Sequence, residues 1–384
     1  MADPTAAMDY SRFYYGGMAG RKPMAAQINA INEQRGKTDL KCAEQIDYRK
    51  MFDTQAGDLD AVLIATPDHV HTVAANMAMR LGKHVYCEKP LGHNVAEVRS
   101  LAKLARETGA ATQLGTITHA GQNYRRVVQW IRSGGIGRVG EVHCWCDDDQ
   151  GAAPDDGTLI WGDRQPQQKP PVPEVLDWDL WLGPARHRPY HPCYVPVTWR
   201  SWWEFGNGRL GDMGCHLIDL PFWALDLKVP LTVEAEGPGR VGQEVAPRWL
   251  IVRWEFAARG SHPPVKLAWY DGNKRPSLPG GERFRDWPMG ILFIGDEGVL
   301  IASYSKYELF PKEKFAQAER PERSLPDSPG HKAEWLAACK GGAAALCNFD
   351  YTGPLSETVL LGTVAYRAGQ KLEWDAENVK VTNC

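Results

Sequence analysis

Apolar and polar residues alternate in blocks that divide the first third of the chain into strands and helices. The apolar runs 61–65 and 84–87 predict two buried strands, and the segment between them has the pattern of a helix. A strand, a helix and a strand within about 30 residues form a parallel unit with a right-handed crossover. Ligands of such sheets bind beyond the carboxyl ends of the strands. In this chain those ends carry Thr66-Pro67 and Glu88-Lys89-Pro90.

The same pattern of apolar and polar residues continues along the chain and predicts two kinds of sheet. A helix over 94–108, a strand over 111–114 and a helix over 123–133 complete a Rossmann-like parallel sheet, which we assign to residues 1–118. Residues 119–384 form a second, α+β domain for substrate binding and oligomerisation. Its consecutive strands predict an open, mainly antiparallel sheet; they are 137–146, 249–256, 265–270, 290–294 and 299–303.

The opening of the chain does not match a complete dinucleotide-binding domain, which starts with a strand, a glycine-rich turn and a helix. The cluster Gly16-Gly17-Met18-Ala19-Gly20 lies too close to the strand at 61–65 to leave room for the intervening elements. A better register makes Thr5–Asp9 the second strand, followed by helices over 22–35 and 47–52. We therefore expect an incomplete nucleotide-binding domain that lacks its first strand and glycine-rich turn, as in an N-terminally truncated chain.

Composition and charge exclude several classes of protein. A net charge of −3 with dispersed basic residues gives no general attraction to nucleic acid or anionic membranes. There is no run of 18 apolar residues and no visible signal peptide. The nine cysteines are irregularly spaced without a CxxC pair, so we expect reduced thiols, no metal site and a cytoplasmic protein.

Two segments of the second domain carry candidate binding chemistry. Asp212 and His216 are four residues apart in a glycine-rich segment, so on a helix they share one face. An aromatic segment over 177–203 includes Tyr194 and Arg200, and aromatic rings with interspersed donors suit a carbohydrate pocket. The alternatives are an N-cap aspartate with a buried histidine, and an aromatic loop packed on its own domain.

The motifs ATPDHVH (65–71) and GKHVYCEKPL (82–91) resemble the Gfo/Idh/MocA family of glucose–fructose oxidoreductase and inositol dehydrogenase relatives. The resemblance runs from about residue 40 to the C-terminus. It implies NAD or NADP as cofactor, with NAD favoured, and a sugar or polyol substrate. It also makes Lys89 the catalytic lysine, with Asp212 and His216 lining the substrate beside it.

The resemblance further implies which residues face the cofactor. These are Asp9 on the adenosine ribose, Thr66, Pro67, His71, Glu88 and Lys89. A solvent-exposed turn is the alternative for Asp9, and packing in the first helical turn is the alternative for His71. For the substrate, the expected residues are Lys89, His119, Tyr194, Arg200, Asp212 and His216.

The resulting prediction is an oxidoreductase that transfers a hydride between NAD(P) and a carbohydrate hydroxyl, with Lys89 as general acid/base. One alternative is a glycoside hydrolase or epimerase that uses transient oxidation. Another is a non-catalytic sugar-binding protein, because the dinucleotide turn is missing. An open sheet needs a covering partner, so we expect a homo-dimer or homo-tetramer.

Overall fold

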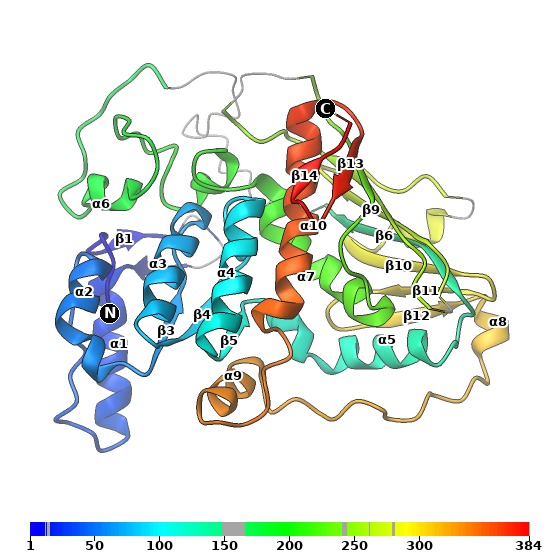
Figure 1. The fold of residues 1–384 in the computed structure, drawn as a ribbon, viewed down its shortest axis with the longest axis horizontal. Helices are drawn as coiled ribbons and strands as arrows, with labels where there is room; N and C mark the ends of the chain where they lie inside the picture. Colours follow the sequence, from blue (N-terminus) through cyan, green and yellow to red (C-terminus); the bar gives the residue numbers. More distant parts are fainter. Residues whose placement is uncertain are drawn as a thin grey trace.

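The computed structural model describes residues 1–383 except 12, 14–15, 148–165, 240–243, 261 and 279–280. Its first sheet is the predicted parallel one, with strands in the order β3 (Ala61–Ile64), β4 (His84–Cys87) and β5 (Thr112–Leu114). The crossovers are α3 (Asp68–Arg80) and α4 (Val95–Thr108). Both loops that carry the motifs therefore lie at the carboxyl edge of this sheet (Figure 1).

The opening residues fold differently from the predicted register. β1 (Met8–Asp9) pairs antiparallel with β2 (Met18–Ala19), and the two form a separate sheet. The prediction that residues 5–9 form a strand of the parallel sheet is therefore wrong. Gly16 and Gly17, at φ 60° and 79°, adopt the left-handed backbone that glycine tolerates and lead the chain back into β2. The predicted helices are present as α1 (Arg21–Gln34) and α2 (Tyr48–Gln55).

The second sheet has nine strands in the order β12-β11-β10-β6-β9-β8-β7-β13-β14. Neighbouring strands are antiparallel except for the central pair, β6 and β9, which is parallel. The sheet is therefore mainly antiparallel, as predicted. The strands are β6 (Val139–Cys146), β7 (Thr232–Glu236), β8 (Ile251–Phe256), β9 (Val265–Asp271), β10 (Met289–Gly295), β11 (Val299–Ala302), β12 (Tyr307–Phe310), β13 (Leu372–Asp375) and β14 (Lys380–Val381).

Helices cover one face of this sheet. α10 (Phe349–Ala368) lies between α4 and the sheet, beside α7 (Gly208–Leu225), while α5 (Gln122–Arg132) packs on α7 (Figure 1). In β8, buried residues alternate with exposed ones, so one face of the strand packs against the helices. On that face Trp254 donates its indole N–H to the Thr358 backbone oxygen of α10. The shorter helices are α6 (Trp178–Leu182), α8 (Lys312–Phe315) and α9 (His331–Cys339). None of the helices in the described ranges is long and apolar enough to cross a bilayer.

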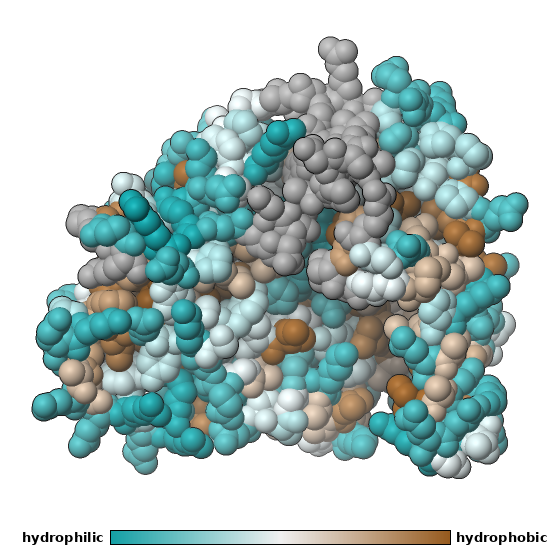
Figure 2. Space-filling view, turned by 180° about the vertical axis from the view of Figure 1, so that it is seen from behind, coloured by the Kyte–Doolittle hydropathy of each residue, from teal (hydrophilic) through white to brown (hydrophobic). Residues whose placement is uncertain are grey.

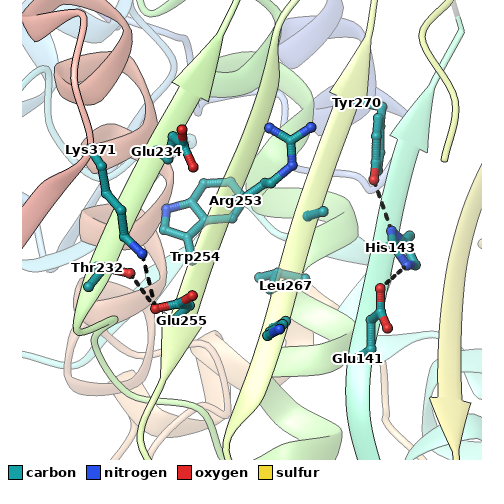
Figure 3. Close-up of a pocket in the computed structure, with 12 residues that line it drawn as sticks. Glu141, His143, Thr232, Glu234, Arg253, Trp254, Glu255, Leu267, Tyr270 and Lys371 are labelled. Carbon is teal, nitrogen blue, oxygen red and sulfur yellow. Dashed lines mark hydrogen bonds and ion pairs between the residues drawn. The ribbon is translucent and has the colours of Figure 1, made fainter. Parts of the chain in front are cut away.

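The opposite face of the large sheet is polar and hollowed. A cavity of about 240 Å³ lies over β6, β7, β8 and β9, and charged side chains line it and form pairs, some within one strand and some across strands (Figure 3). His143 contacts Glu141 at 2.9 Å, and Glu255 contacts Lys371 at 3.3 Å. Elsewhere, on the side seen in Figure 2, hydrophilic residues predominate and hydrophobic ones form small groups. A homo-dimer or homo-tetramer stays a prediction.

Candidate active site

Lys89 and Asp212 form the centre of the candidate site. The loop after β4 carries Lys89, and the first turns of α7 carry Asp212. The Lys89 Nζ atom donates to the Asp212 Oδ1 atom and to the Asp212 backbone oxygen, both at 2.6 Å. Their side chains are only 12% and 16% exposed. The contact therefore joins the two parts of the molecule through a largely buried ion pair.

Arg200 is a second cation on the same carboxylate. Its Nε atom lies 3.1 Å from Asp212 Oδ1, and its guanidinium lies over the Trp199 ring at 4.3 Å. Burial by itself raises the pKa of Asp212. The charges and hydrogen bonds of Lys89 and Arg200 outweigh burial and hold that pKa well below its usual range. Asp212 is therefore a carboxylate near neutral pH, and Arg200 lies beside it, while the predicted contact of Arg200 with a substrate stays a prediction.

His216 lies one helical turn beyond Asp212. Burial, followed by the charge of Lys89, lowers the pKa of His216 to about 3, so its ring is neutral near pH 7. Its Nδ1 atom is buried without a hydrogen-bond partner among the described residues. A buried nitrogen of this kind normally has a partner, so it fits a ligand hydroxyl or a water molecule. The spacing of Asp212 and His216 on one helix face brings both to Lys89.

Asp68 and Asn207 belong to the site although the sequence reasoning did not select them. The Asn207 amide donates to Asp68 Oδ2 at 3.2 Å and to the His93 backbone oxygen at 3.3 Å. Asp68 is only 4% exposed, and burial raises its pKa to about 6, although His93 and the cations Lys89 and Arg200 oppose the shift. The signal was present, since Asp68 is part of the ATPDHVH motif, but the motif was read for its threonine, proline and histidine.

His71 connects the two motif loops. Its Nδ1 atom lies 2.8 Å from the Pro90 oxygen and its Nε2 atom 2.9 Å from the Thr66 oxygen. The ring is 1% exposed, and burial lowers its pKa. The structure thus places His71 behind the loops, in the packing role that was the alternative for it.

Thr66 Oγ1 at the carboxyl edge of the parallel sheet is a buried polar atom that lacks a hydrogen-bond partner among the described residues. Such atoms are uncommon in folded proteins, and they fit the polar groups of a ligand. Further atoms of this kind lie within β4 and β5, in the segment after β5, and on α7 and α9; they are Tyr86 OH, Gln113 Oε1, Thr118 Oγ1, His119 Nε2, His216 Nδ1 and His331 Nδ1. Pro67 precedes α3 at the same edge. The Glu88 carboxylate lies over Gly115, and burial raises its pKa.

These residues fit the nicotinamide end of a dinucleotide, which binds at such an edge. The pyrophosphate of a dinucleotide binds at a glycine-rich turn between a strand and a helix. Within the described ranges, no glycine-rich turn joins a strand of the parallel sheet to a helix, because Gly20 follows β2 of the small antiparallel sheet. Asp9 lies in that sheet, is exposed and accepts from the Ser11 N–H at 2.8 Å. The structure therefore does not bring Asp9 to the carboxyl edge.

Two predicted substrate residues lie elsewhere. Tyr194 is 2% exposed and packs in an aromatic cluster with Trp178, Trp202 and Phe205, which is the packing alternative. His119 is 1% exposed and bonds Asp219 instead. Neither forms a described contact with Lys89.

His119 belongs to a buried hydrogen-bonded cluster. Its Nδ1 atom lies 3.0 and 3.1 Å from the two Asp219 oxygens, and its ring stacks on Trp223 at 3.8 Å. Tyr351 donates to Asp219 at 2.7 Å. Cys347 completes a set whose potential ligand atoms lie within 4.8 Å of one another. His119 and Tyr351 already bond Asp219, and the Cys347 sulfur accepts from the Thr116 hydroxyl at 3.1 Å, which is a structural role.

Comparison with known proteins decides the family. The sequence model for the NAD-binding Rossmann fold of an oxidoreductase family, Gfo/Idh/MocA, matches residues 18–116, and the model for its C-terminal alpha/beta domain matches residues 152–261. The chain belongs to this family. The resemblance read from the two motifs and the predicted fold class are therefore confirmed, and NAD is the cofactor for which the family's Rossmann domain is named.

Named relatives match parts of the chain. Inositol 2-dehydrogenase 1 of Saccharopolyspora erythraea is 29% identical over 140 residues, which is 35% of this chain and 41% of that protein. Levoglucosan dehydrogenase of Pseudarthrobacter phenanthrenivorans is 25% identical over 181 residues, 45% of this chain and 34% of that protein. The matches thus span less than half the length of these relatives.

Solved structures match almost the whole chain. The WlbA dehydrogenase of Bordetella pertussis, in complex with NADH and UDP-GlcNAcA, has a TM-score of 0.61 and 15% identity, and the match covers 93% of this chain and 89% of that one. A levoglucosan dehydrogenase in complex with NADH and levoglucosan has a TM-score of 0.56 and 15% identity, with 92% and 89% covered. At this identity the likeness shows the fold.

Proposed function

We propose that this chain is an oxidoreductase that transfers a hydride between NAD(P), with NAD favoured, and a hydroxyl-bearing carbon of a sugar or polyol. The observation that carries the proposal is the buried contact of Lys89 with Asp212 beside His216, at the edge of the parallel sheet. Family membership supports it, as do the names of relatives that act on inositol and levoglucosan.

Lys89 is the general acid/base of the proposed reaction. When bound, the nicotinamide ring supplies the hydride acceptor or donor. In its neutral form the Lys89 amine takes the proton of the substrate hydroxyl during oxidation, which gives the ammonium that Asp212 holds, and that ammonium returns the proton during reduction. Asp212 holds the amine in place through the two contacts of 2.6 Å and, with Arg200, keeps the local charge balanced. The neutral ring of His216 orients a hydroxyl or relays its proton.

The residues that would face the cofactor are Thr66, Pro67, Glu88 and Lys89. Their support is their position at the carboxyl ends of β3 and β4, together with the buried Thr66 hydroxyl that has no partner among the described residues. His71 would act indirectly by fixing both loops.

The test is Lys89→Met, with Lys103→Met as the matched control. Lys103 is 73% exposed on α4 and pairs with Glu107, so its loss leaves the site untouched. Wild-type protein and both variants are assayed for NADH and NADPH formation with inositols, levoglucosan and aldoses. We expect turnover in the wild type and the control and none in Lys89→Met, with unchanged circular dichroism. Retained turnover in Lys89→Met overturns the role of Lys89.

The same assay separates the rival functions. Glycoside cleavage without net NADH release would indicate transient oxidation. An absence of NADH binding by fluorescence titration, together with sugar binding by calorimetry, would indicate a non-catalytic sugar-binding protein.

A further inference from the structure

The glycine-rich start of α1 has its backbone donors already bonded. A helix start of this kind holds the pyrophosphate of a dinucleotide through its first N–H groups. In this chain the Arg21 N–H donates to the Thr5 carbonyl oxygen at 2.9 Å. The Lys22 N–H donates to the Ala6 carbonyl oxygen, also at 2.9 Å. The following residue is a proline, which has no N–H, and the next N–H bonds the Gly20 oxygen within the helix at 3.2 Å. Among the described residues, the first turn of α1 therefore keeps no backbone N–H for a phosphate.

The same two carbonyl oxygens lie over Gly20, the glycine that precedes α1. A Cβ atom added at Gly20 would lie 3.0 Å from the Thr5 oxygen and 3.1 Å from the Ala6 oxygen. A carbonyl oxygen carries partial negative charge, so this surface disfavours an anion. Oxygens of the chain itself thus lie where a phosphate would need N–H groups.

Two more helices begin at the carboxyl edge of the parallel sheet, and both starts are bonded within the chain. α3 begins with the buried Asp68, and the His69 N–H donates to the Phe205 carbonyl oxygen at 3.3 Å. At the start of α4, the Asn94 side chain accepts from the Glu97 N–H at 3.0 Å. Oxygens of the chain therefore already occupy positions that an anion takes at a helix N-terminus.

The buried polar atoms without a partner include two at the candidate site around Lys89. They are Thr66 Oγ1, directly after β3, and His216 Nδ1, on α7, each without a partner among the described residues. Convergent polar groups of this kind orient a bound ligand. The groups that remain available to a cofactor thus favour the nicotinamide end of a dinucleotide over its pyrophosphate.

We infer that this chain recognises its cofactor through the nicotinamide mononucleotide half, and that the second phosphate and the adenosine add little affinity. The inference rests on the proposed function, because it concerns the cofactor of that site, and it names the part of the cofactor that is recognised. A pyrophosphate held at a free helix start gains up to a factor of about 30 in affinity. With only surface contacts left for the second phosphate, the gain here should be about threefold.

The experiment compares two ligands by binding rather than by turnover. The full chain is titrated with NADH and with reduced nicotinamide mononucleotide, and each Kd is measured by fluorescence. We expect the two Kd values to lie within about threefold of each other. ADP, which carries the adenosine and two phosphates, should not displace the bound mononucleotide. Binding of NADH that is tighter by a factor of about 30 overturns the inference, and so does displacement by ADP.

Three variants locate the contact. Thr66→Val removes the buried hydroxyl, so it should weaken both ligands by the same factor of about five. Lys22→Glu reverses an exposed charge in the first turn of α1 and should leave both Kd values unchanged. Lys103→Glu makes the same change of charge at a position on α4 that is 73% exposed, and it serves as the matched control.

Two results of this series contradict the inference. If Lys22→Glu weakens NADH but not the mononucleotide, while Lys103→Glu weakens neither, the pyrophosphate lies at α1. If Thr66→Val leaves both ligands unaffected, recognition does not take place at this edge of the sheet. Circular dichroism of each variant checks that the fold is unchanged.

The outcomes for the two proposals are distinguishable. If NADH binds far more tightly than the mononucleotide and turnover depends on Lys89, this inference fails and the proposed function stands. If the two ligands bind equally but Lys89→Met retains turnover, the inference stands and the role of Lys89 fails. If neither ligand binds, both proposals are wrong.

Discussion

Removing the two partners of the central ion pair should have unequal effects on stability. Asp212→Asn removes the carboxylate that bonds Lys89 at 2.6 Å and Arg200 at 3.1 Å, and it leaves two cations facing each other in a largely buried site. Removing one partner of a buried ion pair lowers the free energy of unfolding by about 3 kcal/mol or more, and we expect the lower value here. Lys89→Met is milder, because Asp212 keeps Arg200 and the methionine fills the space of the lysine stem. We expect it to cost about 1 kcal/mol.

The assay is urea unfolding at pH 8 with fluorescence detection, using the slope of the transition to check that the unfolded state is unchanged. The matched control is Lys103→Met, which removes an exposed pair with a distance of 3.6 Å. Such pairs contribute less than about 1 kcal/mol, so the control should lie within about 0.5 kcal/mol of the wild type.

The pH dependence gives a second check. The pKa of Asp212 is held below its ordinary value of 3.8, so the stability from its ionisation is present above that value and is lost as pH falls below it. The difference in the free energy of unfolding between the wild type and Asp212→Asn should therefore be constant from pH 8 to 5 and should decrease below about pH 4. The reasoning is refuted if Lys89→Met destabilises as much as Asp212→Asn at pH 8.

Three more substitutions test other parts of the site. Asp68→Asn should stabilise the chain at pH 8 by up to about 3 kcal/mol, because the pKa of Asp68 rises from 3.8 to about 6 on folding, and this advantage should vanish below pH 4 in thermal unfolding. His71→Phe removes the one N–H that the neutral ring can donate to the Pro90 or Thr66 oxygen and leaves that buried oxygen without its donor, so it should cost about 2 kcal/mol by urea unfolding. Gly115→Ala forces the Glu88 carboxylate to move and should weaken NADH binding in a fluorescence titration, while Gly57→Ala, where the added Cβ meets no atom within 4 Å, should not.

Local patterns predicted the elements well where apolar spacing determines them. The strand–helix–strand unit over 61–93 follows from spacing within a few residues, and the structure contains it. The four-residue spacing of Asp212 and His216 suits a helix, and both lie on α7. Family resemblance then supplied the partner of Lys89, since no local pattern connects residues 89 and 212. The two-residue strand at Met8–Asp9 was assigned to the wrong sheet, because so short a segment carries no periodicity.

The remaining errors concern contacts between distant segments. An aromatic segment has the same composition whether its rings line a pocket or pack together, and Tyr194 packs against Trp178 and Trp202. The place of Asp68 in the site depends on Asn207, which lies 139 positions away and has no motif of its own. Only the folded chain reveals that these two side chains meet.

The charges at the site indicate why it needs both parts of the molecule. The nucleotide-binding part supplies Asp68 and Lys89, and the second part supplies Arg200 and Asp212, so each contributes one carboxylate and one cation. Asp212 bonds Lys89 across the junction and Arg200 within the second part. If the parts separated, Lys89 would lose its bonded carboxylate and Asp68 would lose the start of α7. The packing of the two parts against each other therefore both positions Lys89 and pairs its charge.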